Sequence, residues 1–183
     1  MTFILFNLFL VAIILFLFLL LSMVWPPDSP WSPWWTTSEA IAEKMCKLAK
    51  VTEKDIIYDL GCGTGTALIV AAKEYGATGV GIEIDPIRFL CAKFNVKESH
   101  TSKKITLIKD NFNTISLIPA TVLFIYLVPN ALKRLAPKFL KEIRPGTRFI
   151  SYKYAMPIEL FKQKLQLIKH DTKDEIFIYK MLS

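Results

Sequence analysis

The chain has 183 residues, of which 52% are hydrophobic, and its formal net charge is +7. This length leaves room for one domain and one appendage. Its three cysteines, Cys46, Cys62 and Cys91, are an odd number without metal-ligand spacing. The composition therefore argues against a disulfide framework or a zinc site and fits a reducing compartment.

The N-terminus carries the appendage. Residues 3–24 are almost all Leu, Ile, Phe, Val and Ala, and only Asn7 and Ser22 are polar. As a helix this run would span roughly 30 Å, which matches the core of a bilayer. A cleaved signal peptide is the alternative, but no Lys or Arg precedes the run and bulky Trp and Pro follow it. The sequence therefore predicts an uncleaved transmembrane anchor over residues 1–24.

A Pro/Trp-rich spacer, residues 25–35, follows the anchor. Its tryptophans suit the membrane–water interface, and its prolines stop the helix and stiffen the chain; the tryptophans are Trp25, Trp31, Trp34 and Trp35. All 23 Lys and Arg residues come after Trp35. By the positive-inside rule, the remaining domain, residues 36–183, is expected on the cytoplasmic side. The basic charge suits either anionic lipid headgroups or an ordinary solvated surface.

Helical and β-rich patterns alternate through the domain. The first helix, within 36–50, has Ile41, Met45 and Leu48 on one face and a capping box of Thr36 and Glu39. Further helices are predicted at 66–76, 86–99 and 129–146, the first closed by a glycine and the last interrupted at Pro137. Strands are predicted at 55–60, 78–85, 103–111, 120–128 and 147–154, and a two-stranded hairpin at 164–182.

This alternation predicts an α/β fold with a doubly wound, mostly parallel, seven-stranded sheet of the Rossmann-like type. The C-terminal hairpin would add antiparallel strands at one edge. Ligands in such sheets bind beyond the carboxyl ends of the strands, near the point where the strand order reverses. Residues that follow the strands are therefore the candidates for a functional site.

The most informative stretch is a glycine loop directly after the first strand. Asp59, Gly61, Gly63 and Gly65 form an acid-x-G-x-G-x-G pattern that also includes Cys62. A tight turn needs one glycine, whereas three at alternate positions indicate a ligand that lies against the backbone. The spacing differs from the G-x-G-x-x-G of dinucleotide sites, and Asp59 would attract an ammonium group. The pattern favours a nucleoside that carries an amino acid.

Polar residues at the ends of the next two strands support this interpretation. Glu83, beside Ile84, lies about 20 residues beyond the glycines, where an acid commonly holds ribose hydroxyls. Asp110 and Asn111 could reach an adenine edge, with Phe112 near its face. An ordinary surface acid and an ordinary Asp-Asn turn are the respective alternatives.

Together, "DLGCGTG", "GIEIDP" and "KDN" resemble three cofactor motifs of the class I S-adenosylmethionine-dependent methyltransferases. The resemblance implies that Asp59 and the Gly61–Gly65 loop hold the methionine moiety. It also implies that Glu83 binds the ribose hydroxyls and Asp110 the adenine amine. Cys62, Ile84 and Asn111 belong to the same three motifs.

A narrower resemblance links four parts of the chain to small membrane-anchored lysine methyltransferases similar to the ATP synthase c-subunit lysine methyltransferase family. These parts are the anchor, the spacer, the Thr-containing segment before the first helix and residues 122–151. This resemblance implies that Thr36 or Thr37 helps to close the cofactor site, while helix capping is an equal alternative for both. Tyr126, at the end of the fourth strand, would border a channel for a lysine side chain, or would only pack there.

The methyl acceptor is the least determined feature. The segment after the fourth strand lacks the Asn/Asp-Pro-Pro-aromatic motif typical of superfamily members that modify adenine or glutamine amides. No general base is evident, since His100 and His170 lie in polar, solvated contexts. The expected substrate is a lysine of a membrane-associated protein, with no metal and no nucleic acid involved. A small molecule, lipid or quinone substrate and a non-catalytic cofactor-binding module are the alternatives.

Overall fold

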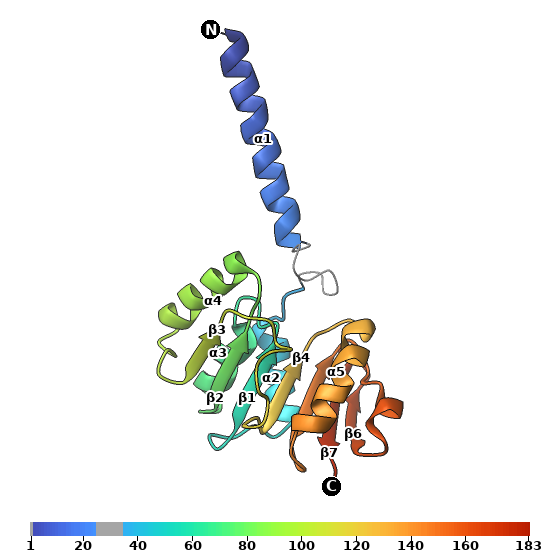
Figure 1. The fold of residues 1–183 in the computed structure, drawn as a ribbon. Coiled ribbons are helices and arrows are strands. Elements are labelled where there is room, and N and C mark those ends of the chain that lie inside the picture. Colours follow the sequence, from blue (N-terminus) through green and yellow to red (C-terminus); the bar gives the residue numbers. More distant parts are fainter. Residues whose placement is uncertain (1, 25–34) are drawn as a thin grey trace.

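The structure, a computed structural model, describes residues 2–24 and 35–183 (Figure 1). Helix α1, Thr2–Val24, is a long apolar helix. Its window Phe3–Leu20 has a mean hydropathy of 3.1 and is exposed throughout. By length and composition it could cross a membrane, although a signal sequence would pass the same test. The predicted interfacial roles of Trp25, Trp31 and Trp34 fall outside the described residues.

A seven-stranded sheet forms the centre of the remaining chain, in the order β3-β2-β1-β4-β5-β7-β6. The pairs among β1 to β5 are parallel, and β7 pairs antiparallel with both β5 and β6. The predicted doubly wound sheet and its C-terminal hairpin are confirmed. The strands are β1 (Ile56–Leu60), β2 (Thr78–Ile82), β3 (Ile105–Ile108), β4 (Val122–Ile125), β5 (Arg148–Tyr152), β6 (Leu165–Asp171) and β7 (Ile176–Met181).

Helices cover both faces of this sheet (Figure 1). The helices are α2 (Glu39–Leu48), α3 (Thr66–Glu74), α4 (Pro86–Glu98) and α5 (Pro129–Glu142), with a short 3₁₀ helix, η1 (Ile158–Phe161). One core contains α2, α3 and part of α4. The other contains α5 and η1. Strand residues alternate between the two cores: Val122 and Phe124 face the first, whereas Leu123 and Ile125 face the second.

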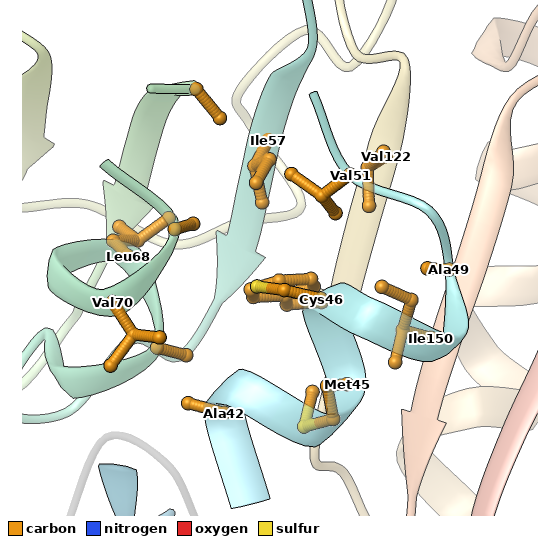
Figure 2. Packing of buried hydrophobic residues seen from close by; sticks show 14 of the residues in the cluster. Ala42, Met45, Cys46, Ala49, Val51, Ile57, Leu68, Val70, Val122 and Ile150 are labelled. Atoms are coloured by element: carbon orange, nitrogen blue, oxygen red, sulfur yellow. The ribbon is translucent and has the colours of Figure 1, made fainter. Parts of the chain in front are cut away.

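The first core depends on the apolar face of α2. Met45 and Cys46 are buried there, and the partly buried Ile41 and Leu48 pack against the same cluster. Figure 2 shows Cys46 among side chains from α3 and the sheet, including Ile57. The helical spacing of these residues confirms the periodicity on which the helix was predicted.

Two local predictions were wrong. The N-cap of α2 is Ser38, whose hydroxyl accepts a hydrogen bond from the backbone N–H of Ile41 at 3.3 Å, so Thr36 does not form the capping box with Glu39. Helix α5 also continues without interruption through Pro137. Pro137 has no backbone N–H, so the helix loses one hydrogen bond there. Burial of an apolar face of α5 against the sheet offsets this loss. That face contains Ala131, Leu132, Leu135, Ala136 and Phe139.

A polar cluster joins elements at the amino end of the central strands, opposite the edge where ligands are expected. Asp55 pairs with Arg148 and accepts a hydrogen bond from the Thr121 hydroxyl at 2.8 Å. Arg148 also donates to the carbonyls of Ala49 and Lys50, at 2.6 and 2.9 Å. The cluster therefore ties the start of β1 to β5 and to the end of α2.

Strand β2 and helix α3 come very close at Gly81. A Cβ added to this glycine would lie 2.8 Å from side-chain atoms of Cys62, Leu68 and Leu107. Such distances are below van der Waals contact, so any larger residue at this position would force these three side chains to move. This approach brings the segment after β1 against β2.

Candidate active site

A pocket opens at the carboxyl ends of β1 and β4, which are neighbours in the sheet although β2 and β3 lie between them in sequence. This is the point at which the strand order reverses, where ligands bind in such sheets. The pocket contains about 820 Å³ of empty space, counted out to the open solvent.

The glycine loop forms one wall of the pocket. Gly61, Gly63 and Gly65 all have positive φ, at 82°, 55° and 79°. A Cβ at Gly61 would meet nothing closer than Leu127, at 4.0 Å, and both residues line the pocket. The glycine therefore leaves the backbone open toward the site. On the outer side, the Asn95 amide donates to the Thr64 carbonyl at 3.0 Å and connects the loop to α4.

Glu83 lies just beyond the end of β2 and is only 4% exposed. Its Oε2 accepts a hydrogen bond from the Gly63 N–H and its Oε1 accepts one from the Asp85 N–H, both at 2.9 Å. A carboxylate has about four acceptor positions, so two remain for a ligand. Burial raises the pKa of Glu83, while the hydrogen bonds from Asp85 and Gly63 and the charge of Arg88 oppose the rise.

Asp59, the acid that leads the glycine pattern, is 8% exposed and lines the same pocket. Burial, with further repulsion from Glu83, raises its pKa to about 7. Two buried carboxylates at one site make it favourable for a cation. An ammonium group beside Asp59 would restore the ionised carboxylate, and a phosphate would be repelled.

Arg88 is a pocket residue that sequence reasoning missed. It lies on α4, is 6% exposed, and lines the pocket with Glu83 and Ile84. Asp85 caps this helix by accepting from the N–H groups of Ile87 and Arg88, at 3.0 and 2.8 Å. Burial lowers the pKa of Arg88, and the charges of Glu83 and Asp85 raise it. The guanidinium thus offsets part of the acidic charge at the end of β2.

The residues after β3 divide into two groups. Phe112 lines the pocket, whereas Asp110 is exposed. The Asp110 carboxylate accepts from the Asn111 N–H at 2.6 Å, and the Asn111 amide oxygen accepts from the Asn113 N–H at 2.9 Å. These are local turn bonds. The predicted contacts of Asp110 and Asn111 with adenine stay a prediction, as do the cofactor contacts of the other predicted residues.

The segment before α2 and the end of β4 both contribute to the lining of the pocket. Thr36 and Thr37 line it together with Trp35, and the cap function that was their alternative belongs to Ser38. Tyr126 also lines it, and burial and the nearby Tyr152 and Tyr154 raise its pKa to about 12. Its hydroxyl is therefore protonated at neutral pH. His100 and His170 are not among the lining residues.

The donor set fits S-adenosylmethionine. Buried carboxylates suit its ammonium group and its ribose hydroxyls, the open glycine backbone allows close approach, and Phe112 and Ile84 offer apolar contact for a flat base. Burial holds the pKa of Cys62 well above its usual range, so this lining thiol stays neutral. Among residues 2–24 and 35–183, no group of three His, Cys, Asp or Glu side chains could hold a metal ion.

Fold and site together define a class I S-adenosylmethionine-dependent methyltransferase. Residues 59–160 match the family described as the ANTKMT methyltransferase domain, and the chain belongs to this family. Both the superfamily and the enzyme class expected from the sequence are thereby confirmed. The alternative of a non-catalytic cofactor-binding module is set aside.

Individual relatives agree with this assignment. A protein-lysine N-methyltransferase of Saccharolobus islandicus is 36% identical over 133 residues, which cover 72% of this chain and 81% of that protein. An RNA methyltransferase of Salinibacter ruber, solved in complex with S-adenosyl-L-homocysteine, is similar in structure with a TM-score of 0.75. It is 30% identical, and the match covers 81% of this chain and 95% of that one. A ribosomal protein L11 methyltransferase of Ralstonia pickettii is 33% identical over 93 residues, covering 50% of this chain and 30% of that protein.

Proposed function

We propose that this enzyme methylates a lysine side chain of a membrane-associated protein on the cytoplasmic side of a membrane. The observation that carries the proposal is the similarity to a protein-lysine N-methyltransferase over 81% of that protein's length. In this proposal residues 1–24 anchor the enzyme, residues 25–35 are an interfacial spacer and residues 36–183 are the catalytic domain. The apolar composition of α1 and the placement of every Lys and Arg after Trp35 support the anchor and its orientation.

The chemistry of the pocket supports an amine acceptor. When bound, S-adenosylmethionine supplies the methyl group. We assign Asp59 and the Gly61–Gly65 loop to its amino-acid part and Glu83 to its ribose. Tyr126, whose phenol is neutral, would border the acceptor and orient it without acting as a base. A neutral amine needs orientation more than proton transfer, so a pocket wall without a base suffices.

One experiment tests the acceptor class. Membranes of the host are incubated with the purified full-length enzyme and methyl-labelled S-adenosylmethionine, and protein, lipid and RNA are then separated. The proposal predicts label in a protein band, mapped to lysine by mass spectrometry. Label confined to the organic phase would instead establish a lipid or quinone substrate. Label confined to RNA would establish an activity like the one named for the Salinibacter relative. A Glu83→Ala enzyme serves as the control for background transfer.

A further inference from the structure

Aromatic side chains from separate parts of the chain meet beside the pocket, and two of them, Trp35 and Tyr126, line it. The ring of Trp35 lies 5.6 Å from that of Tyr126 and 6.1 Å from that of Tyr154, measured between centroids, with interplanar angles of 31° and 26°. Tyr126 in turn meets Tyr152 edge-on, at 4.6 Å. These four residues, the aromatic wall, come from the segment before α2, the end of β4 and the end of β5.

Part of the aromatic wall is accessible from the pocket. Trp35 is 46% exposed, and Trp35 and Tyr126 both line the pocket. Tyr152 is buried and packs against Tyr126. Ring faces carry negative electrostatic potential and attract ammonium groups, most strongly those of tryptophan and tyrosine.

One ammonium group of the chain already contacts a ring of the aromatic wall, that of Tyr152. The exposed Lys153 holds its Nζ 5.0 Å from the centroid of the Tyr152 ring, within the range of a cation–π contact. The pocket's two buried acids, Asp59 and Glu83, lie instead at the ends of β1 and β2. The site thus has two different cation-attracting regions, one built from carboxylates and one from rings.

We propose that Trp35, Tyr126 and Tyr154, backed by Tyr152, bind the methylated ammonium group of a lysine at the pocket entrance. Rings favour a methylated ammonium because it sheds water easily and covers the ring face, whereas a carboxylate would favour the small, strongly hydrated ammonium. The assignment to lysine rests on the proposed function. The ability of the aromatic wall to bind a quaternary ammonium group is independent of the proposed function. It can be measured without methyl transfer.

The test compares choline with its neutral isostere, 3,3-dimethyl-1-butanol. The full-length enzyme is kept in a maltoside detergent, since phosphocholine detergents would compete, and binding is followed by saturation-transfer NMR on the methyl signals of each probe. Choline is expected to bind at least about fivefold more tightly than the isostere. Trp35→Leu and Tyr154→Leu should each lose most of this preference, while Trp35→Phe and Tyr154→Phe should keep most of it.

Phe94→Leu is the matched control, because Phe94 is an aromatic residue on α4 that is 65% exposed and lies outside the wall. Cooperative thermal unfolding, measured in every variant, reports that the fold is intact. Equal binding of choline and its isostere would overturn the proposal, as would unchanged choline binding in both leucine variants. Choline binding at the wall together with label only in lipid or RNA would refute the lysine assignment and leave the ammonium site standing.

Discussion

Glu83 accepts a hydrogen bond from the backbone N–H of Gly63 at 2.9 Å, so the acid at the end of β2 holds the glycine loop that follows β1. The second oxygen of the same carboxylate accepts from Asp85, which begins α4. One buried side chain therefore sets the relative positions of the two segments on which we expect the cofactor to lie. This dual role makes Glu83 the most informative residue to change.

Glu83→Gln should weaken S-adenosylhomocysteine binding by roughly tenfold or more, about 1.5–3 kcal/mol. The amide keeps the shape of the side chain but replaces one acceptor by a donor, which then faces a backbone N–H. Calorimetric titration measures the change. Glu98→Gln, at the exposed end of α4, should bind like the unmodified enzyme. Equal affinities of the two variants would rule out this role for Glu83.

The raised pKa of Asp59, about 7, predicts pH-dependent binding. Below that pH the unliganded site holds a protonated Asp59, which must release its proton when an ammonium group binds beside it. Affinity for S-adenosylhomocysteine should therefore rise with pH, by up to about tenfold per unit, and level off above about pH 7.

Two measurements isolate this effect. Titrations in buffers with different protonation enthalpies should reveal net proton release on binding at about pH 6. Asp59→Asn should bind more weakly and lose most of the pH dependence, which separates Asp59 from the neighbouring Glu83. An unmodified enzyme whose affinity is flat across this range would contradict the assignment of Asp59 to the ammonium group.

Gly81→Ala should destabilise the fold by about 1–3 kcal/mol, because the added methyl would lie 2.8 Å from atoms of Cys62, Leu68 and Leu107. Displacement of Cys62 should also weaken cofactor binding, since that residue lines the pocket. Urea unfolding measures the stability. Thr78→Ala, at an exposed position on the same strand, is the control and should have little effect.

Breaking the Asp55–Arg148 pair should lower stability and leave the site intact. Asp55→Ala removes a buried partner and should cost about 3 kcal/mol in the free energy of unfolding. Asp174→Ala, which removes one of two acids from a partly exposed pair with Lys44, should have a much smaller effect. The folded Asp55 variant should bind S-adenosylhomocysteine with unchanged affinity, because the pair lies at the amino end of the strands.

The proposed orientation can be checked in intact cells. Protease added from outside should leave residues 36–183 undigested, since every Lys and Arg follows Trp35 and favours the cytoplasmic side. Permeabilised cells provide the control, in which the same protease should degrade the domain. Digestion without permeabilisation would reverse the orientation.

Much of this architecture could be predicted because its signals are local. The alternation of β-rich and helical segments determined the sheet, and the glycines after β1 identified the edge where the pocket lies. The two wrong local predictions concern the N-cap of α2 and the predicted interruption of α5, and both depend on packing. Thr36, Thr37 and Ser38 are all good N-caps, and only the packing of α2 decides among them. Pro137 was expected to break α5, but burial of the apolar face outweighs one missing hydrogen bond.

Other features could not be found from sequence because they depend on contacts between distant residues. Arg88 lies in an ordinary helical pattern, and its place beside Glu83 and Ile84 follows from how α4 packs against the sheet. The rings of Trp35 and Tyr154 are more than a hundred residues apart in the chain. Nothing in the local pattern around either residue indicates the other, so the aromatic wall becomes visible only in the folded protein.

Trp35 is at once a wall of the pocket and the first described residue after helix α1, and only ten residues, 25–34, separate it from Val24. Even at full extension this connection is no longer than about 40 Å. In an enzyme whose α1 crosses a bilayer, the acceptor entrance would therefore stay within a thin layer along the membrane surface. Enzyme and substrate would then meet by diffusion in two dimensions. An acceptor protein in the same membrane would be methylated even if the enzyme binds it weakly, whereas an identical lysine on a protein in the bulk cytosol would not.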